Sequence, residues 1–258
     1  CFIRSLRAAN GFPLSLKTIF ESLYGAGSNA RLKLAGMEYC IWTLQHADQD
    51  QLRLVGPLVL QGLVKSLTGQ RPATLDQGAV RLRAFSYEGI AELSKRLPQA
   101  FSDNVEIIGV LMREVTTEVE QVKVSAMECL RLIASAYKST GSDAKAKLEQ
   151  MLNVTVSSPS VTLRLLSVAW ASTVFKTQDL HGLFLVIQAT GDAEESVSQE
   201  AEKLLKWERL QEEAGKGAVS TSKMHEYFVK RHGGADNDPV LMTMIKAIRC
   251  VRTGELRH

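Results

Sequence analysis

A short pattern of apolar and small residues recurs five times along the chain, and each copy is typical of one face of an α-helix. The first, apolar positions of the five copies are Leu32, Val80, Val122, Leu163 and Val197. The small residues four positions further on are Gly36, Ala84, Ala126, Ser167 and Ala201. A larger residue follows at an offset of seven, and offsets of 0, 4 and 7 lie on the same side of a helix. We therefore expect the five pattern helices to lie side by side, with Ala84, Ala126, Ser167 and Ala201 buried against neighbouring helices.

The stretches between the pattern helices are also apolar at helical spacing, which predicts a partner helix before each of them. The predicted partner helices cover residues 13–23, 52–67, 105–117, 144–153 and 180–189. Glycine, serine and proline residues gather between the predicted helices, where helical hairpins need turns. Asp76, Asp103 and Asp192 each precede a predicted helix, and we expect them to cap its first backbone amides.

The spacing of the pattern indicates a repeat architecture. Successive first positions are 34 to 48 residues apart, and a HEAT or armadillo repeat, a helical hairpin that stacks on its neighbours, takes about 40–47 residues. The sequence therefore predicts an all-α fold, a HEAT/armadillo-like α-solenoid of stacked antiparallel helix pairs. We expect about five to six pairs in residues 1–207, a linker in residues 208–222 and further helices in residues 223–258.

Composition narrows the range of partners without changing the predicted fold. Of 258 residues, 31 are basic and 28 are acidic, so the net charge is only +3 and the two signs are interleaved. Nucleic-acid binding, which depends on a basic patch, is therefore not expected. The apolar runs fall short of the ~18 residues of a membrane span, which argues against membrane insertion. Because the chain begins at Cys1 and not at a methionine, we expect an internal fragment of a longer solenoid.

The placement of cysteine and histidine gives no sign of catalysis or metal binding. The four cysteines lie far apart without a CxxC pair, as is typical of reduced thiols in cytoplasmic and nuclear proteins. None of the five histidines belongs to an HExxH motif or stands at metal-ligand spacing from a cysteine pair. We therefore predict a non-enzymatic protein without catalytic residues, cofactor or bound metal.

A basic residue directly follows the first position in four of the five copies, at Lys33, Arg81, Lys123 and Arg164. Two interpretations of this basic ladder stay open. Each cation can bond to the turn of its own repeat, as nearby Asp76 and Glu120 allow, or the four together can form a stripe that binds an acidic partner. We favour bonding within each repeat, because the ladder recurs with the repeat itself.

Four stretches of the sequence carry a resemblance to a known family. They are residues 54–63 (LVGPLVLQGL), 85–98 (FSYEGIAELSKRLP), 171–175 (ASTVF) and 189–195 (ATGDAEE) with Glu200 and Ala201. By their order and spacing, the chain resembles over about residues 50–205 the large proteasome-associated HEAT-repeat adaptor and scaffold proteins of eukaryotes. The resemblance implies a protein that binds both the proteasome core and its regulatory particle, stabilises or surveys that assembly, and links it to other cell components.

A second class of function stays open at this point. Transport receptors of the karyopherin kind are also built from helical repeats but carry cargo, and other HEAT-repeat adaptors share the pattern. Proteasome subunits that co-purify with the protein would favour the scaffold, whereas nucleoporins and a small GTPase would favour the transport receptor. The sequence does not identify the residues that bind a partner.

Overall fold

The computed structural model describes residues 29–69, 76–102, 104–175 and 180–205. The chain divides into two compact units, residues 1–145 and residues 146–258, and each is described by itself. The predicted segments 13–23, 208–222 and 223–258 lie outside the described residues, as does Asp103. The boundaries proposed for the repeat array, the linker and the final helices therefore stay predictions.

The described part of the first unit consists of helices joined by short turns. In chain order they are α3 (Ala30–His46), α4 (Gln49–Thr68), α5 (Gln77–Arg96), the short α6 (Gln99–Ser102), α7 (Glu106–Thr117), α8 (Glu120–Ala134) and the 3-10 helix η1 (Ser135–Tyr137). Helix α9 (Ser142–Thr155) begins at the end of this unit and continues into the second. The second unit adds α10 (Val161–Val174), α11 (Leu180–Thr190) and α12 (Glu195–Leu205). Among the described residues no strand occurs.

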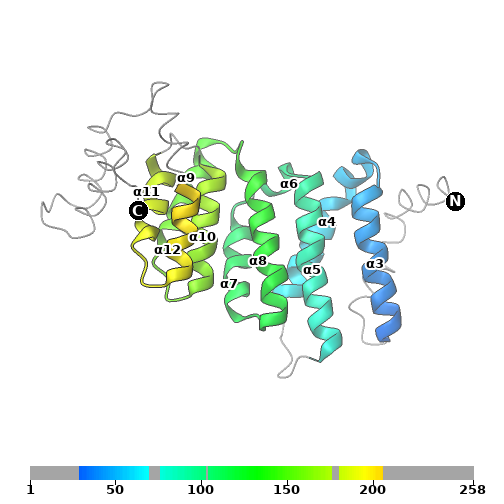
Figure 1. The fold of residues 1–258 in the computed structure, drawn as a ribbon. Helices are drawn as coiled ribbons and strands as arrows, with labels where there is room; N and C mark the ends of the chain where they lie inside the picture. The colour runs from blue at the N-terminus through cyan, green and yellow to red at the C-terminus, as the bar shows by residue number, and fades with distance from the viewer. Residues whose placement is uncertain (1–28, 70–75, 103, 176–179, 206–258) are drawn as a thin grey trace, which may run out of the picture. The chain divides into compact units, whose positions relative to one another are not determined.

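All five copies of the sequence pattern lie in helices, namely α3, α5, α8, α10 and α12. Four predicted partner helices are also present, as α4, α7, α9 and α11. In the first unit the pattern helices α3, α5 and α8 pack side by side, while α4 packs on α5 and α7 on α8 (Figure 1). In the second unit α10, α11 and α12 contact one another. The all-α, HEAT-like arrangement of helix pairs is therefore confirmed within each unit.

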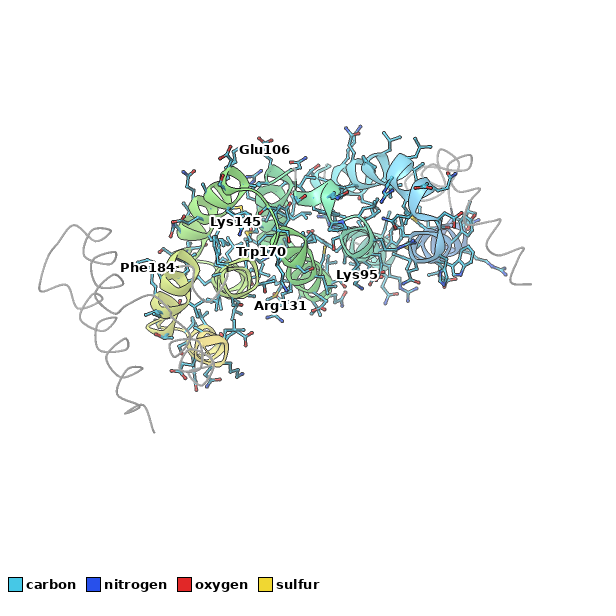
Figure 2. All side chains as sticks on the ribbon, turned by 90° about the horizontal axis from the view of Figure 1, so that it is seen from above. Lys95, Glu106, Arg131, Lys145, Trp170 and Phe184 are labelled. Atoms are coloured by element: carbon cyan, nitrogen blue, oxygen red, sulfur yellow. The ribbon has the colours of Figure 1, made fainter. Side chains whose placement is uncertain are left out.

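The two kinds of helix form separate layers in the first unit. Viewed from above, Lys95 of α5 and Arg131 of α8 stand on one side of the unit, and Glu106 of α7 stands on the opposite side (Figure 2). Pattern helices thus make one layer and partner helices the other, with the apolar core between them. This is the packing expected of helices that each bury one apolar face.

The pattern positions are most deeply buried in α8, α10 and α12. Ala126, Ser167 and Ala201, the small residues of these helices, are completely buried, as predicted. The prediction fails at Ala84 of α5, which is only half-buried, and Gly36 of α3 is half-buried as well. In α3 the buried face includes Met37, Cys40, Leu44 and Ala47, whereas the predicted first position Leu32 is 47% exposed. The buried face of α3 is therefore rotated relative to the sequence pattern.

Two glycines lie where α4 and α5 come close together. A Cβ atom at Gly56 of α4 would lie 2.3 Å from Leu97 Cδ1, and one at Gly89 of α5 would lie 2.9 Å from Leu63 Cδ1. A side chain at either position would therefore displace the end of a leucine side chain, and no backbone atom stands in its way. None of the described helices is both long and apolar enough to cross a membrane.

Local capping follows the sequence prediction at one of the two testable positions. Asp76 is the N-cap of α5, and its Oδ1 accepts a hydrogen bond of 2.6 Å from the backbone amide of Ala79. Asp192 accepts from the amide of Glu194 at 2.8 Å, in the turn before α12 rather than within that helix. Its carboxylate is shared with an arginine described below.

Candidate functional site

A groove opens between α3 and α5 on the surface of the first unit, with a volume of about 460 Å³. Its apolar lining comes from both helices: Leu34, Met37, Ile41, Trp42, Ala84 and Phe85. Met37 and Phe85 are buried and form the floor, whereas Leu34 is 42% exposed and belongs to the rim. A concave, mostly apolar surface of this volume is in the range of binding sites in proteins.

Hydrogen bonds join α3 and α5 near their C-terminal ends. Near the C-terminal end of α5, Arg96 donates to the carbonyl oxygens of Leu44 at 2.9 Å and Ala47 at 2.7 Å. Gln49 donates to the carbonyl of Arg96 at 2.8 Å. These bonds join the end of α3 and the start of α4 to the end of α5, whereas the groove residues of α5 lie nearer its start, between Arg81 and Glu88.

Three charged side chains line the groove. Glu38 stands on α3, and Arg81 and Glu88 stand on α5. Among the described residues none of the three has an ion-pair partner. Burial against the groove raises the pKa of the Glu88 carboxyl, because partial loss of water disfavours its charged form. The groove therefore combines an apolar floor with two carboxylates that face solvent on opposite walls.

An aromatic stack fixes the position of Trp42, the largest side chain at the groove. Its ring lies 6.2 Å from that of Tyr39 and 5.1 Å from that of His46, at interplanar angles of 21° and 20°. His46 Nδ1 also lies 2.8 Å from the carbonyl oxygen of Trp42. The three residues follow helical spacing along α3, so the stack restricts the half-buried indole without covering it completely.

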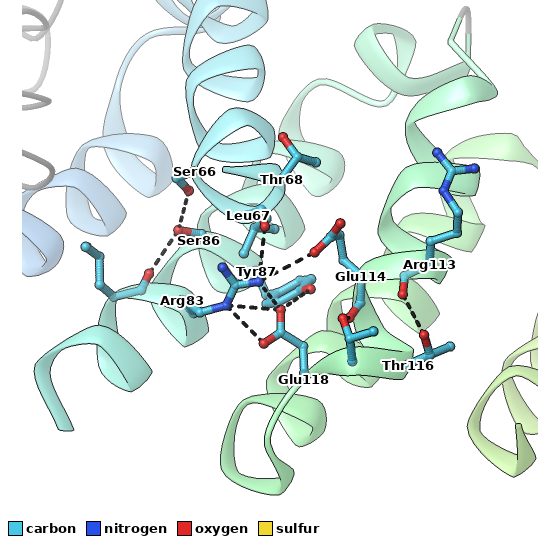
Figure 3. A network of polar contacts seen from close by, with 12 residues as sticks. Ser66, Leu67, Thr68, Arg83, Ser86, Tyr87, Arg113, Glu114, Thr116 and Glu118 are labelled. Atoms are coloured by element: carbon cyan, nitrogen blue, oxygen red, sulfur yellow. Dashed lines mark hydrogen bonds and ion pairs between the residues drawn. The ribbon is translucent and has the colours of Figure 1, made fainter. Parts of the chain in front are cut away.

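A buried ionic network joins three helices of the first unit (Figure 3). Arg83 Nε donates to both carboxylate oxygens of Glu118, at 3.0 and 3.2 Å, and Arg83 Nη2 donates to the carbonyl of Leu67 at 3.1 Å. Tyr87 donates its hydroxyl to Glu118 at 3.0 Å, and Glu114 lies 3.7 Å from the guanidinium. The Glu118 side chain is completely buried. A buried carboxylate needs such partners, since without them its desolvation would be very costly.

Two pKa values reflect this network. Burial, which would lower the pKa of Arg83, is outweighed by the hydrogen bond and charge of Glu118, so that the net shift is upward. Burial and the nearby Glu118 carboxylate together raise the pKa of Tyr87. Arg83 therefore stays charged and Tyr87 stays neutral at neutral pH. The network holds the helices together.

A related connection occurs in the second unit. Arg164 donates to the two carboxylate oxygens of Asp192 at 2.7 and 3.1 Å, and to the carbonyl oxygen of Ser158 at 2.8 Å. Its side chain is 14% exposed and that of Asp192 is 10% exposed. The arginine therefore ties the turn before α10 to the turn before α12.

The four members of the predicted basic ladder have different surroundings within their units. Lys33 is half-buried on α3, Arg81 lies exposed at the groove, Lys123 pairs with Glu120 of its own helix, and Arg164 binds two turns as described above. Arg164 and Lys123 thus make bonds of the kind we favoured, and Arg81 does not pair with Asp76, which instead caps α5. That the four basic residues together bind an acidic partner remains a hypothesis.

Sequence reasoning missed three residues that make long-range connections in the first unit, namely Arg83, Arg96 and Glu118. The sequence held one sign of this network, since Arg83 stands among the apolar positions that form the buried face of α5. A charge at such a position requires a partner from another element. The partner itself, 35 residues away, has no signature in the sequence.

The described cysteines are unsuited to nucleophilic chemistry. Burial raises the pKa of the Cys40 thiol to about 12 and also raises the pKa of the Cys129 thiol. Both thiols are therefore protonated at neutral pH, and the thiolate is the reactive species. In the described ranges no group of three or more histidine, cysteine or acidic residues is arranged to hold a metal ion.

Comparison with known proteins gives one family and one curated relative. The family model described as "Proteasome component ECM29, N-terminal" matches residues 1–189. The human (Homo sapiens) proteasome adapter and scaffold protein ECM29 is 24% identical to the chain over 204 residues, which make up 79% of this chain and 11% of that protein. The chain thus spans about a tenth of the length of this relative.

A comparison of folds finds an engineered protein of known crystal structure. It is 13% identical, the match covers 93% of this chain and 97% of that chain, and the TM-score is 0.45. A score at this level carries no argument about function.

Proposed function

The chain belongs to the family of the proteasome component ECM29, N-terminal, and from this premise we propose that it is part of a protein-binding scaffold that associates with the proteasome. The observation that carries the proposal is the family match, which extends over residues 1–189. The curated human relative is named a proteasome adapter and scaffold protein. In finer detail, we propose that the scaffold tethers or stabilises the core and regulatory particles and links them to other components of the cytoplasm and nucleus.

The fold supports this proposal because stacked helix pairs offer long surfaces for binding other proteins. We also propose that the scaffold acts without chemistry of its own. In its support, the most deeply buried charges, Arg83 and Glu118, are used to join helices, and the described thiols are held protonated. Three charged residues without an ion-pair partner in the described part of the chain, Glu38, Arg81 and Glu88, line an exposed groove, where they are available to a partner.

Affinity purification tests the proposal. The protein that carries this chain is tagged in its own cells, purified at several salt concentrations, and its partners are quantified by mass spectrometry. We expect subunits of both the core and the regulatory particle to be enriched over a purification with the tag alone. Enrichment of nucleoporins and a small GTPase instead, or of no proteasome subunit at low salt, would refute the proposal.

A further inference from the structure

The small residue of the repeat pattern has different surroundings in α5 than in α8, α10 and α12. Ala126, Ser167 and Ala201 are completely covered by neighbouring elements, whereas Ala84 of α5 is half-buried and lines the groove. In this fold a small residue marks a place where another helix can come close. At Ala84 this place is open to solvent.

The walls of the groove favour a helix over an extended strand as occupant. Both walls are α-helices, whose backbone groups are already used in internal hydrogen bonds. They offer no free edge to which a strand could pair, whereas a helix satisfies its own backbone and needs only an apolar surface. From Leu34 to Gln45, the α3 wall is about 16 Å long at ~1.5 Å per residue, so it matches roughly three turns of a docked helix.

The charges of the groove specify the polar part of the occupant. Glu38 and Glu88 lie on opposite walls without ion-pair partners among the described residues. The raised pKa of Glu88 reflects a carboxylate that has lost part of its water, and a cation placed beside it would restore a favourable interaction. With Arg81 on the α5 wall, the groove carries two carboxylates and one cation, so its net negative charge disfavours the phosphates of a nucleic acid and suits a protein.

Trp42 supplies the anchor that such a contact needs. Tryptophan is enriched among the residues that dominate binding energy in protein interfaces. Here the indole is half-buried and held by its stack with Tyr39 and His46, so little side-chain freedom remains to be lost on binding.

We propose that the groove between α3 and α5 docks a short helical segment of a partner protein, with large apolar side chains against Met37, Ala84 and Phe85 and a lysine or arginine between Glu38 and Glu88. The inference rests on the proposed function in taking the chain as a protein-binding scaffold. It holds for any partner of this chemistry, within the proteasome or outside it.

A display experiment on the 258-residue chain tests the inference. The probe is a phage library of 18-residue alanine-rich helices in which the apolar and charged positions are randomised. We expect the enriched peptides to carry apolar residues at i, i+4 and i+7 and an excess of lysine and arginine over acidic residues. Binding of a synthetic enriched peptide should shift the Trp42 fluorescence to shorter wavelength, measured as the difference from Trp42→Phe.

Charge reversal supplies the decisive variant. Glu38→Lys together with Glu88→Lys should weaken the basic peptides at least tenfold and select acidic peptides from the same library. Glu38→Lys alone, at an exposed position, should give a smaller effect in the same direction and covers the case that the double variant does not fold. The matched control is Glu128→Lys on exposed α8 surface outside the groove, which should leave the affinity unchanged.

Three results would overturn the inference: no enriched peptide, enriched peptides that are acidic, or binding that Glu38→Lys and Glu88→Lys leave unchanged. Competition by synthetic peptides of residues 1–28 or 206–258 would assign the groove to a segment of this chain instead. A concentration-dependent dimer that is lost on filling the groove with Ala84→Leu would assign it to a second copy. Peptide binding at the groove is measured independently of the proteasome purification. The two experiments therefore distinguish an error in the groove inference from an error in the proposed function.

Discussion

Arg83 in the first unit and Arg164 in the second make the same kind of connection in different surroundings. Each donates to a main-chain carbonyl earlier in the chain and to both oxygens of a carboxylate 28 or 35 residues later. The Arg83 network is buried and includes a tyrosine, whereas the Arg164 pair keeps some contact with water. The comparison teaches that one structural task, joining consecutive helix pairs, is performed by arginines at different positions of the repeat.

Loss of Glu118 should have the largest effect, because it leaves a guanidinium buried without its main partner. We expect Glu118→Ala to lower the free energy of unfolding by about 3–5 kcal/mol, measured by urea denaturation followed by circular dichroism. A double variant, Arg83→Met with Glu118→Leu, removes both charges and should lose less than Glu118→Ala alone. Equal or greater loss in the double variant would mean that the residues act by packing and not as a charge pair.

Loss of Asp192 should cost less, since its partner Arg164 is closer to water and keeps the Ser158 carbonyl. We expect Asp192→Ala to reduce the free energy of unfolding by about 1.5 kcal/mol, the low end for hydrogen bonds to charged groups. The same denaturation measurement applies, with the exposed Glu128→Ala as control. A loss as large as that of Glu118→Ala would show that the two connections are energetically alike.

Removal of Arg81 should have the smallest effect and would sharpen the distinction between neighbouring arginines of α5. Arg81 is exposed at the groove and has no ion pair among the described residues, whereas Arg83, two positions on, is buried. We expect Arg81→Ala to change the free energy of unfolding by no more than about 0.5 kcal/mol. A loss above about 1 kcal/mol in the same denaturation assay would place Arg81 in the structural network after all.

The helices could be predicted from the sequence because the same pattern of apolar and small residues recurs five times. Any single copy of the pattern is weak, but the recurrence of a small residue such as Ala126 between larger apolar residues fixes both the helix and its buried side. The rotation of α3, where Met37 and Cys40 take the buried face, could not be predicted. It depends on which neighbouring side chains the helix meets.

The connections and the groove were beyond sequence reasoning for a related reason. The ladder pointed to Arg81, but a rotation of two residues on a helix turns a side chain through about 200°, so Arg83 makes the buried bonds and Arg81 faces the groove. Ala84 was expected to be buried because the pattern makes it so elsewhere. Its partial exposure depends on how closely α3 approaches α5 beside it, which the pattern of one helix does not show.

Arg83 and Arg96 also complete the ends of helices other than their own. The last carbonyl groups of a helix lack partners within it and form the negative end of its dipole. Arg83 binds such a carbonyl at Leu67 of α4, and Arg96 binds those of Leu44 and Ala47 at the end of α3. Because Arg96 belongs to the repeat after α3, a repeat isolated from its successor would lose part of the termination of its own pattern helix.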